Sequence, residues 1–350
     1  MEAIKRGKIF ARPRMELGEA APLAAPLSLE IDVSGLCNLQ CKFCFRNDSV
    51  SKETATPSYS FMKTVMDFEL YQKIINDVKE SGWLLKKLKL SCFGEPLLNP
   101  RLADMIRLAK SSGITEYIEL TTNGIAFTEE MCRNLVEAGL DRVNISINGL
   151  TSEDYQKNCL RAVDVAALRE KIAYLYSIRN NCWIYVKLGD VGFSAEEKQT
   201  FYKMFSNLCD EIFIENILDD AFKDAHAEGK KTTSKKTGAY DQDMIYKAVC
   251  PFLFSRMIVN TEGIVCACCM DWKAEHSLGD LKKDPIADIW NGAVLKNLQK
   301  MHLLGKRESI HICRGCAAPS AFTIDNMDKY ADEVLERLSW RNSEHGKYSI

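Results

Sequence analysis

Residues 29–44, LEIDVSGLCNLQCKFC, combine a strand-like run with three closely spaced cysteines. Cys37, Cys41 and Cys44 lie four and three residues apart, so the loop after the strand can turn the three sulfur atoms toward one point. Zinc normally takes four protein ligands in a structural site, or three mixed ligands and a water in a catalytic one. Three thiols without a nearby fourth instead suit an iron–sulfur cluster with one open iron, because cysteine thiolates hold such clusters. A partial zinc site or three unrelated thiols are the alternatives.

The composition describes an ordinary globular chain of 350 residues, 46% hydrophobic and 27% charged, with a net charge of −2. This length exceeds the size at which single cores usually stop growing, so we expect two domains. The small charge gives no electrostatic reason to expect a nucleic acid or a membrane as partner, and no run reaches the roughly 18 apolar residues of a membrane span. Fourteen cysteines without a secretory signal indicate metal or redox chemistry in a reducing compartment. We therefore expect a cytoplasmic protein.

Strand-like and helical segments alternate between residues 28 and 217. Strands are expected where short apolar runs are bounded by turn residues, at 29–33, 85–90, 117–120, 142–147, 183–188 and 211–216. Helices are expected where apolar residues recur with helical spacing, at 67–80, 101–111, 128–138, about 160–179 and 195–207. This alternation predicts an α/β fold with a parallel sheet and right-handed crossovers. In parallel α/β sheets of this kind the functional residues gather at the carboxyl ends of the strands.

Residues suited to binding a small polar ligand follow three of the predicted strands. Gly94-Glu95-Pro96 follows the second, Thr122-Asn123-Gly124 ends the third, and Ser146 to Gly149 ends the fourth. Glycine lets the backbone approach a ligand closely, and Asn, Ser and Thr can hydrogen-bond a ribose or an amino-acid group. Each segment alone is also ordinary turn sequence. Their succession after the three cysteines is what indicates a shared site.

Over residues 28–217 the chain resembles the core of the radical S-adenosylmethionine (SAM) enzymes, a partial (β/α)6 TIM-like barrel. The C-x3-C-x2-C spacing of Cys37, Cys41 and Cys44, with Phe43 before the last cysteine, matches the motif that binds the family's [4Fe–4S] cluster. The resemblance implies that this cluster binds SAM and cleaves it reductively to a 5′-deoxyadenosyl radical, which abstracts hydrogen from a substrate. It also implies an electron donor such as flavodoxin or ferredoxin.

The same resemblance implies which residues bind SAM. Gly94, Glu95 and Pro96 match the family's G-G-E-P motif, which holds the methionine amino group, although Phe93 replaces its first glycine. Phe43 would lie on the adenine side, with core packing as its alternative role. The residues implied near the SAM carboxylate and ribose are Thr122, Asn123, Ser146 and Asn148. Many relatives have Asp where Asn148 stands.

A second group of cysteines follows near the C-terminus. A predicted hairpin at 257–265 separates Cys250 from Cys266, Cys268 and Cys269, and a C-x2-C pair follows at Cys313 and Cys316. Four of these thiols would complete a metal site, for which zinc is the alternative to iron and sulfur. The pattern resembles the SPASM/twitch extension of radical SAM enzymes. It implies one auxiliary [4Fe–4S] cluster on Cys250, Cys268, Cys313 and Cys316, with Cys269 as a reserve ligand.

These assignments divide the chain into five parts. They are an N-terminal arm (1–27), the radical SAM core (28–217), a linker or lid (218–248), a small auxiliary-cluster domain of a β-hairpin and helices (249–320), and a C-terminal helix and tail (321–350).

A single auxiliary cluster makes the chain similar to the twitch-type dehydrogenases, of which one acts on an aminocyclitol. We therefore expect a two-electron oxidation of a small sugar or cyclitol, with the auxiliary cluster accepting an electron. Peptide modification or epimerisation is the alternative within the family, and a zinc-binding interaction protein is the alternative outside it. Cys159 is a candidate hydrogen donor to a substrate radical, and Lys187 and Asn216 are candidate pocket residues. The remaining cysteines are mostly expected in the core.

Overall fold

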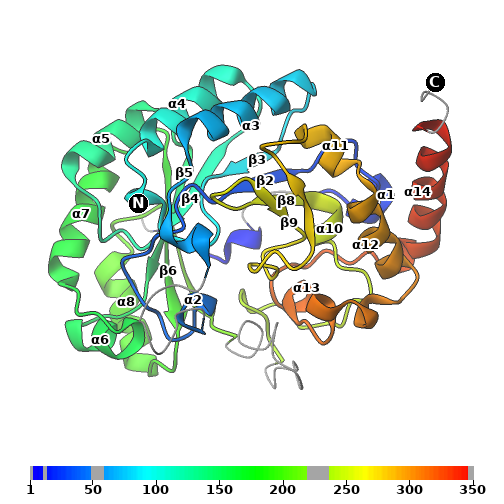
Figure 1. The fold of residues 1–350 in the computed structure, drawn as a ribbon. Coiled ribbons are helices and arrows are strands. Elements are labelled where there is room, and N and C mark those ends of the chain that lie inside the picture. The colour runs from blue at the N-terminus through cyan, green and yellow to red at the C-terminus, as the bar shows by residue number, and fades with distance from the viewer. Residues whose placement is uncertain (1–2, 11–13, 49–58, 219–235, 346–350) are drawn as a thin grey trace.

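The computed structural model describes residues 3–10, 14–48, 59–218 and 236–345. Six central strands pair in parallel in chain order, and two of them, at 142–147 and 211–216, have the predicted bounds. They are β2 (Ser28–Ile31), β3 (Lys87–Lys89), β4 (Ile118–Thr122), β5 (Arg142–Ile147), β6 (Trp183–Asp190) and β7 (Glu211–Asn216). The predicted parallel α/β fold is thus confirmed. Figure 1 shows these strands surrounded on their outer side by helices.

Five outer helices cover the strands, and a polar side chain caps the first turn of all but α4. They are α3 (Phe68–Glu80), α4 (Leu102–Ser112), α5 (Glu129–Glu137), α7 (Val165–Ile178) and α8 (Ala195–Phe205). Asp67 accepts the Glu69 N–H at the start of α3, and Thr128 accepts the Met131 N–H at the start of α5. Such caps satisfy backbone donors that have no partner within the helix.

The single helix expected at about 160–179 is wrong in its N-terminal part. The structure has a separate helix α6 (Ser152–Cys159) first, and α7 begins only at Val165. Thr151 and Asp154 form a capping box at the start of α6, and Leu160 ends this helix with a φ of 53°. Asp164 then caps α7 by accepting the Ala167 N–H. The two caps and the left-handed residue between them divide the segment.

The N-terminal arm is part of the sheet. Strand β1 (Ile4–Lys5) pairs in parallel with β7, and a 3-10 turn over Lys8–Phe10 follows it. The arm continues to a short helix α1 (Leu17–Ala20), whose Gly18 and Glu19 carbonyl oxygens accept hydrogen bonds from Arg337. Arg337 lies in the C-terminal helix α14 (Ala331–His345).

The C-terminal hairpin joins the same sheet. Strand β8 (Arg256–Val259) pairs in parallel with β2, and β9 (Ile264–Cys266) and β10 (Ser277–Asp280) follow in antiparallel order, which gives the sequence β1-β7-β6-β5-β4-β3-β2-β8-β9-β10. The hairpin was predicted, but β10 was not. Helices α10 (Phe252–Ser255), α11 (Ile286–Trp290), α12 (Ala293–Leu303) and α13 (Ala318–Ala321) gather beside these strands (Figure 1). Residues 219–235 of the expected linker, and residues 49–58 after the first cysteines, lie outside the described residues.

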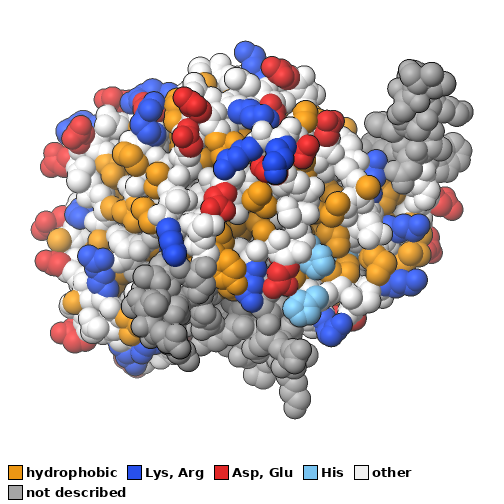
Figure 2. Space-filling view, viewed as in Figure 1, with side chains coloured by type: hydrophobic (Ala, Val, Ile, Leu, Met, Phe, Trp, Pro, Cys, Tyr) orange, Lys and Arg blue, Asp and Glu red, His pale blue; other side chains and the backbone are white. Residues whose placement is uncertain are grey.

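One hydrophobic core connects the barrel to the C-terminal part. It contains Leu29 and Ile74 from the barrel together with Val259, Ile289 and Leu298 from the C-terminal elements. On the face shown in Figure 2, acidic and basic side chains are interspersed over the helices. None of the described helices has the length and apolar character that crossing a membrane requires.

Candidate active site

Asp32 ties the loop that carries the first cysteines to the end of β3. Its Oδ1 accepts the backbone N–H groups of Cys92 at 3.3 Å, Phe93 at 2.9 Å and Gly94 at 3.2 Å. Gly94 fits here because a methyl group at this position would overlap the carbonyl oxygens of Ser34 and Leu36. The two strand ends therefore meet backbone to backbone.

Phe93 replaces a glycine of the family motif without opening this contact. Its ring is buried and lies edge-on to the rings of Phe45 and Phe61, with centroids 5.8 and 5.7 Å away. Such aromatic pairs favour edge-to-face geometry. Phe93, which departs from the motif, therefore forms an aromatic cluster with Phe45 and Phe61 beside the loop.

The thiols of Cys37, Cys41 and Cys44 lie near one another after β2. Burial raises the pKa of Cys37 to about 11 and that of Cys44 to about 12, and the neighbouring thiols raise both further. The Cys44 N–H donates to the Cys41 carbonyl at 3.0 Å, which tightens the loop. Three thiolates so close together would repel one another unless a cationic centre compensates them. The donor set therefore fits an iron–sulfur cluster.

Cys159 and Asn148 lie against Cys41. The Cys159 Sγ is 3.4 Å from the Cys41 Sγ, and Asn148 Nδ2 is 3.7 Å from the same sulfur. The Cys159 side chain is fully buried and does not line the large cavity described below. This position brings Cys159 to the cluster cysteines and away from a substrate in that cavity.

Glu95 is buried at the end of β3 and joins it to β4. Its carboxylate accepts the Thr122 hydroxyl at 2.5 Å, the Asn123 N–H at 2.8 Å and the Leu97 N–H at 3.1 Å. Burial raises its pKa to about 7, although these hydrogen bonds oppose the shift. The expected SAM residues Glu95, Thr122 and Asn123 are thus brought together.

The other expected SAM residues surround this group. Asn123 Nδ2 donates to Asn38 Oδ1 in the cysteine loop at 2.6 Å, which links β4 to that loop. Pro96 is buried and begins a 3-10 turn, η3 (Pro96–Leu98). Ser146 is half-buried on β5, and Phe43 lines the large cavity beside Cys44.

Four cysteines of the second group line one enclosed space of about 20 Å³: Cys250, Cys268, Cys313 and Cys316. Among the described residues, no three His, Cys, Asp or Glu side chains are close enough to hold a single metal ion. Cys269 does not line this space and instead lines the large cavity.

His302 provides an independent test of whether a cluster fits there. Its Nδ1 accepts the Cys250 N–H at 3.1 Å, so the ring proton is on Nε2. This Nε2 is buried and has no hydrogen-bond partner among the described residues. The sulfur atoms of a cluster in the adjoining space would accept its proton. The chemistry of the residues therefore fits an auxiliary iron–sulfur cluster.

A cavity of about 510 Å³ lies between the two groups of cysteines. Phe43 and Cys44 line it from the first loop, whereas Phe252, Arg256 and Cys269 line it from the C-terminal part. Cys92 lines it as well, whereas the other remaining cysteines, Cys132, Cys159, Cys182 and Cys209, are buried in the core, in line with the expectation that most of these cysteines lie there. This volume is sufficient to hold a small substrate next to both groups.

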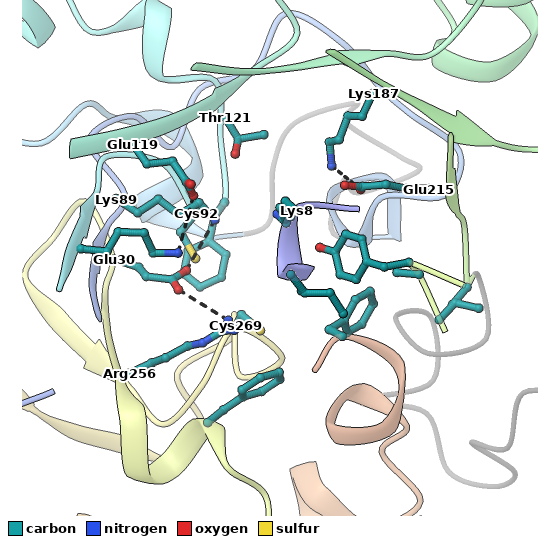
Figure 3. A pocket seen from close by; sticks show the side chains of 18 of the residues that line it. Lys8, Glu30, Lys89, Cys92, Glu119, Thr121, Lys187, Glu215, Arg256 and Cys269 are labelled. Atoms are coloured by element: carbon teal, nitrogen blue, oxygen red, sulfur yellow. Dashed lines mark hydrogen bonds and ion pairs between the residues drawn. The ribbon is translucent and has the colours of Figure 1, made fainter. Parts of the chain in front are cut away.

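Charged side chains occupy one register row of the sheet inside this cavity. Glu30 pairs with Lys89 across β2 and β3, Lys89 with Glu119 across β3 and β4, and Glu119 with Arg142 across β4 and β5. Figure 3 shows Glu30, Lys89 and Glu119 grouped on one side of the cavity. Burial would raise the pKa of both glutamates, but the neighbouring cations lower each to about 2.

Figure 3 shows Lys187, one of the two expected pocket residues, with Glu215 on the opposite side of the cavity. Lys187 Nζ donates to Glu215 Oε2 at 2.6 Å, and Glu215 Oε1 accepts the Tyr185 hydroxyl at 3.1 Å. Asn216 also lines the cavity and donates to Asp241 at 2.8 Å.

Sequence reasoning missed most of the cavity lining, including Lys8, Glu30, Lys89, Glu119 and Arg256. A signal was present in the strands. Parallel strands buried on both faces are normally almost continuously apolar, so charged residues inside the predicted runs at 29–33, 85–90 and 117–120 indicated inward-facing polar positions. No comparable signal exists for Lys8, which lies in the N-terminal arm.

Comparison with known proteins agrees with this geometry. Residues 31–205 match the model of the radical SAM superfamily, and residues 250–317 match SPASM, an iron–sulfur cluster-binding domain. A GTP 3′,8-cyclase of Aquifex aeolicus is 33% identical over 191 residues, which are 53% of this chain and 55% of the relative. The chain thus matches little more than half the length of this relative.

Two solved structures share the fold. The structure of BtrN with AdoMet and 2-DOIA has 15% identity and a TM-score of 0.52, covering 87% of this chain and 95% of BtrN. Streptococcus suis SuiB bound to its precursor peptide SuiA has 13% identity and a TM-score of 0.58, covering 80% of this chain and 67% of SuiB. The family matches confirm the expected cofactors, a [4Fe–4S] cluster with SAM and an auxiliary iron–sulfur cluster. The chain belongs to the radical SAM superfamily and carries a SPASM domain toward its C-terminus.

Proposed function

We propose that this enzyme oxidises a small polar molecule, of the sugar or cyclitol type, by two electrons. The observation that carries the proposal is the single cavity of about 510 Å³ lined by Cys44 on one side and Cys269 on the other. Cys269 is next in sequence to Cys268, a proposed ligand of the auxiliary cluster. A substrate in this cavity would lie close to both cofactor sites.

The bound clusters and SAM supply the one-electron chemistry, and the protein positions the reactants. Conversion of an alcohol to a ketone removes one hydrogen atom, one proton and one electron from the substrate. The bound SAM would take up the hydrogen atom at its 5′-carbon, and an auxiliary iron–sulfur centre held by Cys250, Cys268, Cys313 and Cys316 would accept the electron. One SAM is therefore consumed per product. An external reductant, such as flavodoxin or ferredoxin, would supply the electron that cleaves SAM.

We assign the roles of the chain's own residues accordingly. Cys37, Cys41 and Cys44 hold the SAM-binding cluster, and Cys250, Cys268, Cys313 and Cys316 hold the auxiliary one. Glu95, with the backbone of Gly94, orients the methionine end of SAM, and the residues Phe43, Pro96, Thr122, Asn123, Ser146 and Asn148 complete that site. The Lys187–Glu215 pair is the candidate acceptor of the substrate proton because it is the ionic pair at 2.6 Å that lines the cavity. All the cysteines are free of disulfide bonds, which supports a reducing compartment such as the cytoplasm.

A redox-neutral rearrangement of a nucleotide is the second candidate. The 33% identity to a GTP 3′,8-cyclase favours it, as does the number of cations in the cavity. Peptide modification is a weaker alternative, since its support is a shared fold at 13% identity.

The reaction class can be tested by product mass. The reconstituted enzyme is incubated without oxygen with SAM, a reductant and a panel of cyclitols, sugars, nucleotides and short peptides. We expect 5′-deoxyadenosine and a product two mass units lighter in a 1:1 ratio. A product of unchanged mass would overturn the oxidation and support epimerisation or cyclisation. The Lys187→Met variant should still form 5′-deoxyadenosine but less product, whereas Cys44→Ala should form neither.

A further inference from the structure

The large cavity contains more cations than carboxylates can compensate. Three of its cations have a close partner. Arg142 donates to Glu211 at 2.6 Å, Lys187 to Glu215 at 2.6 Å, and Arg14 pairs with Asp325. The Lys187–Glu215 and Arg14–Asp325 pairs are one to one, whereas Glu211 is shared between Arg142 and Arg6, which does not line the cavity.

The remaining lining charges are four cations, Lys8, Lys87, Lys89 and Arg256, and two carboxylates, Glu30 and Glu119. Subtracting the two carboxylates from the four cations leaves two positive charges. Glu30 lies 3.5 Å from Lys89 and 3.5 Å from Arg256, and Glu119 lies 3.6 Å from Lys87. These separations exceed those of a charge-assisted hydrogen bond, roughly 2.7–2.9 Å. Most of the N–H groups of these cations therefore remain available for a ligand.

Lys8 contributes most clearly to this excess of positive charge in the cavity. It makes no ion pair with any described residue, and its Nζ lies 5.8 Å from the centroid of the Tyr240 ring. In Figure 3 it projects between the group around Glu119 and the Lys187–Glu215 pair. Lys8 thus has no close ionic partner among the described residues, although its charge helps to lower the pKa of Glu119 and of Glu215. A cation in this position can bind an anion in the cavity.

A purely structural explanation accounts for part of the row but not for the surplus. Glu30, Lys89, Glu119 and Arg142 alternate in sign and would compensate one another without any ligand. Barrel interiors are usually filled by branched apolar side chains, and burying charge is costly unless it is paired. Because Arg142 is already paired with Glu211, however, the four cations Lys8, Lys87, Lys89 and Arg256 face only two carboxylates, Glu30 and Glu119.

We propose that the substrate carries a phosphate group and that Lys8, Lys89 and Arg256 bind it inside the large cavity. A phosphate monoester carries a charge of about −1.5 to −2 at pH 7, which matches a surplus of two positive charges. A carboxylate, with a single negative charge, matches it less well. The inference rests on the proposed function only in taking this cavity as the substrate site.

Lys8→Met is the decisive variant because Lys8 makes no ion pair that its loss would break. Lys5→Met is the matched control. Lys5 lies three residues earlier in the same arm, is exposed, and has its Nζ 5.0 Å from the Tyr202 ring instead of in the cavity.

Binding of inorganic phosphate to the reconstituted enzyme is measured by calorimetry at constant ionic strength, with acetate as the second probe. We expect saturable phosphate binding that Lys8→Met weakens about tenfold, the effect of losing one charged hydrogen bond, and that Lys5→Met leaves unchanged. Absence of saturable binding, equal effects of the two variants, or acetate binding as tightly as phosphate would each overturn the inference.

The two proposals fail in different ways. Phosphate binding without any SAM cleavage would keep the phosphate site and overturn the proposed enzyme function. Oxidation of an uncharged sugar without any phosphate binding would keep the proposed enzyme function and overturn the phosphate site.

Discussion

Asp32 shows how one buried carboxylate can organise the loop of an active site. Its Oδ1 accepts three backbone N–H groups from the end of β3, while its Oδ2 is buried without a hydrogen-bond partner among the described residues. Burial raises its pKa from 3.8 to about 6. Between these pH values the folded protein holds a proton that the unfolded chain releases. The stability of the wild type therefore falls as the pH rises through this window.

We predict that Asp32→Asn removes this part of the pH dependence. The asparagine oxygen still accepts the three N–H groups but carries no charge. Between pH 4 and 7 the variant should gain about 3 kcal/mol of unfolding free energy relative to the wild type, since each pKa unit corresponds to about 1.4 kcal/mol. Urea unfolding at several pH values measures this. Parallel curves for the two proteins would contradict the prediction, and Asp32→Ala, which loses the acceptor, should be less stable throughout.

His302 offers a prediction about the auxiliary cluster. Asparagine at this position can still accept the Cys250 N–H through an oxygen near the place of Nδ1, but it lacks a donor at the place of Nε2. Hydrogen bonds to cluster sulfur atoms help to set the reduction potential. We expect His302→Asn to keep its iron and to show a more negative potential for the auxiliary cluster. Redox titration followed by electron paramagnetic resonance measures this. In His302→Gln, whose amide can donate near the place of Nε2, the potential should stay closer to the wild type.

At the scale of elements, the turn between β3 and η3 depends on a close backbone approach. The Glu95 N–H donates to the Leu36 carbonyl at 2.7 Å, and Gly94 lies against the backbone of Ser34 and Leu36. A side chain at Gly94 would push this turn away from the cysteine loop.

We predict that Gly94→Ala destabilises the protein by about 1–3 kcal/mol, the usual cost of overpacking, and lowers the iron bound at the first site. Iron analysis and thermal unfolding measure the two effects. Phe93→Leu serves as the control, since it changes the neighbouring side chain and leaves the backbone contact intact. Iron content in Gly94→Ala equal to that of the wild type would contradict this account of the turn.

At the scale of the whole molecule, the two cysteine groups form separate sites on opposite sides of one cavity. We predict about eight iron and eight sulfide ions per chain, as two [4Fe–4S] clusters. The triple variant Cys37→Ala, Cys41→Ala and Cys44→Ala should keep about four of each. Iron and zinc analysis of anaerobically reconstituted protein measures this. About four irons with one zinc in the wild type would remove the proposed electron acceptor and favour a redox-neutral reaction.

The sequence by itself determined the parallel barrel, the SAM-binding motif and the two groups of cysteines. These features are local, because strand and helix periodicity and the spacing of Cys37, Cys41 and Cys44 operate within a few residues of the chain. Local signals were weaker where two helices follow each other, and there the caps at Thr151 and Asp164 were not recognised.

Only the tertiary structure decided what surrounds the substrate cavity. Cys268 and Cys269 are neighbours in sequence, yet they line different spaces, because the chain bends and turns here after β9 ends at Cys266. Lys8 enters the cavity because β1 pairs with β7, more than 200 positions later in the chain. Arg256 reaches Glu30 because β8 pairs with β2. Contacts of this kind depend on how distant strands pair, and a local sequence pattern does not contain that information.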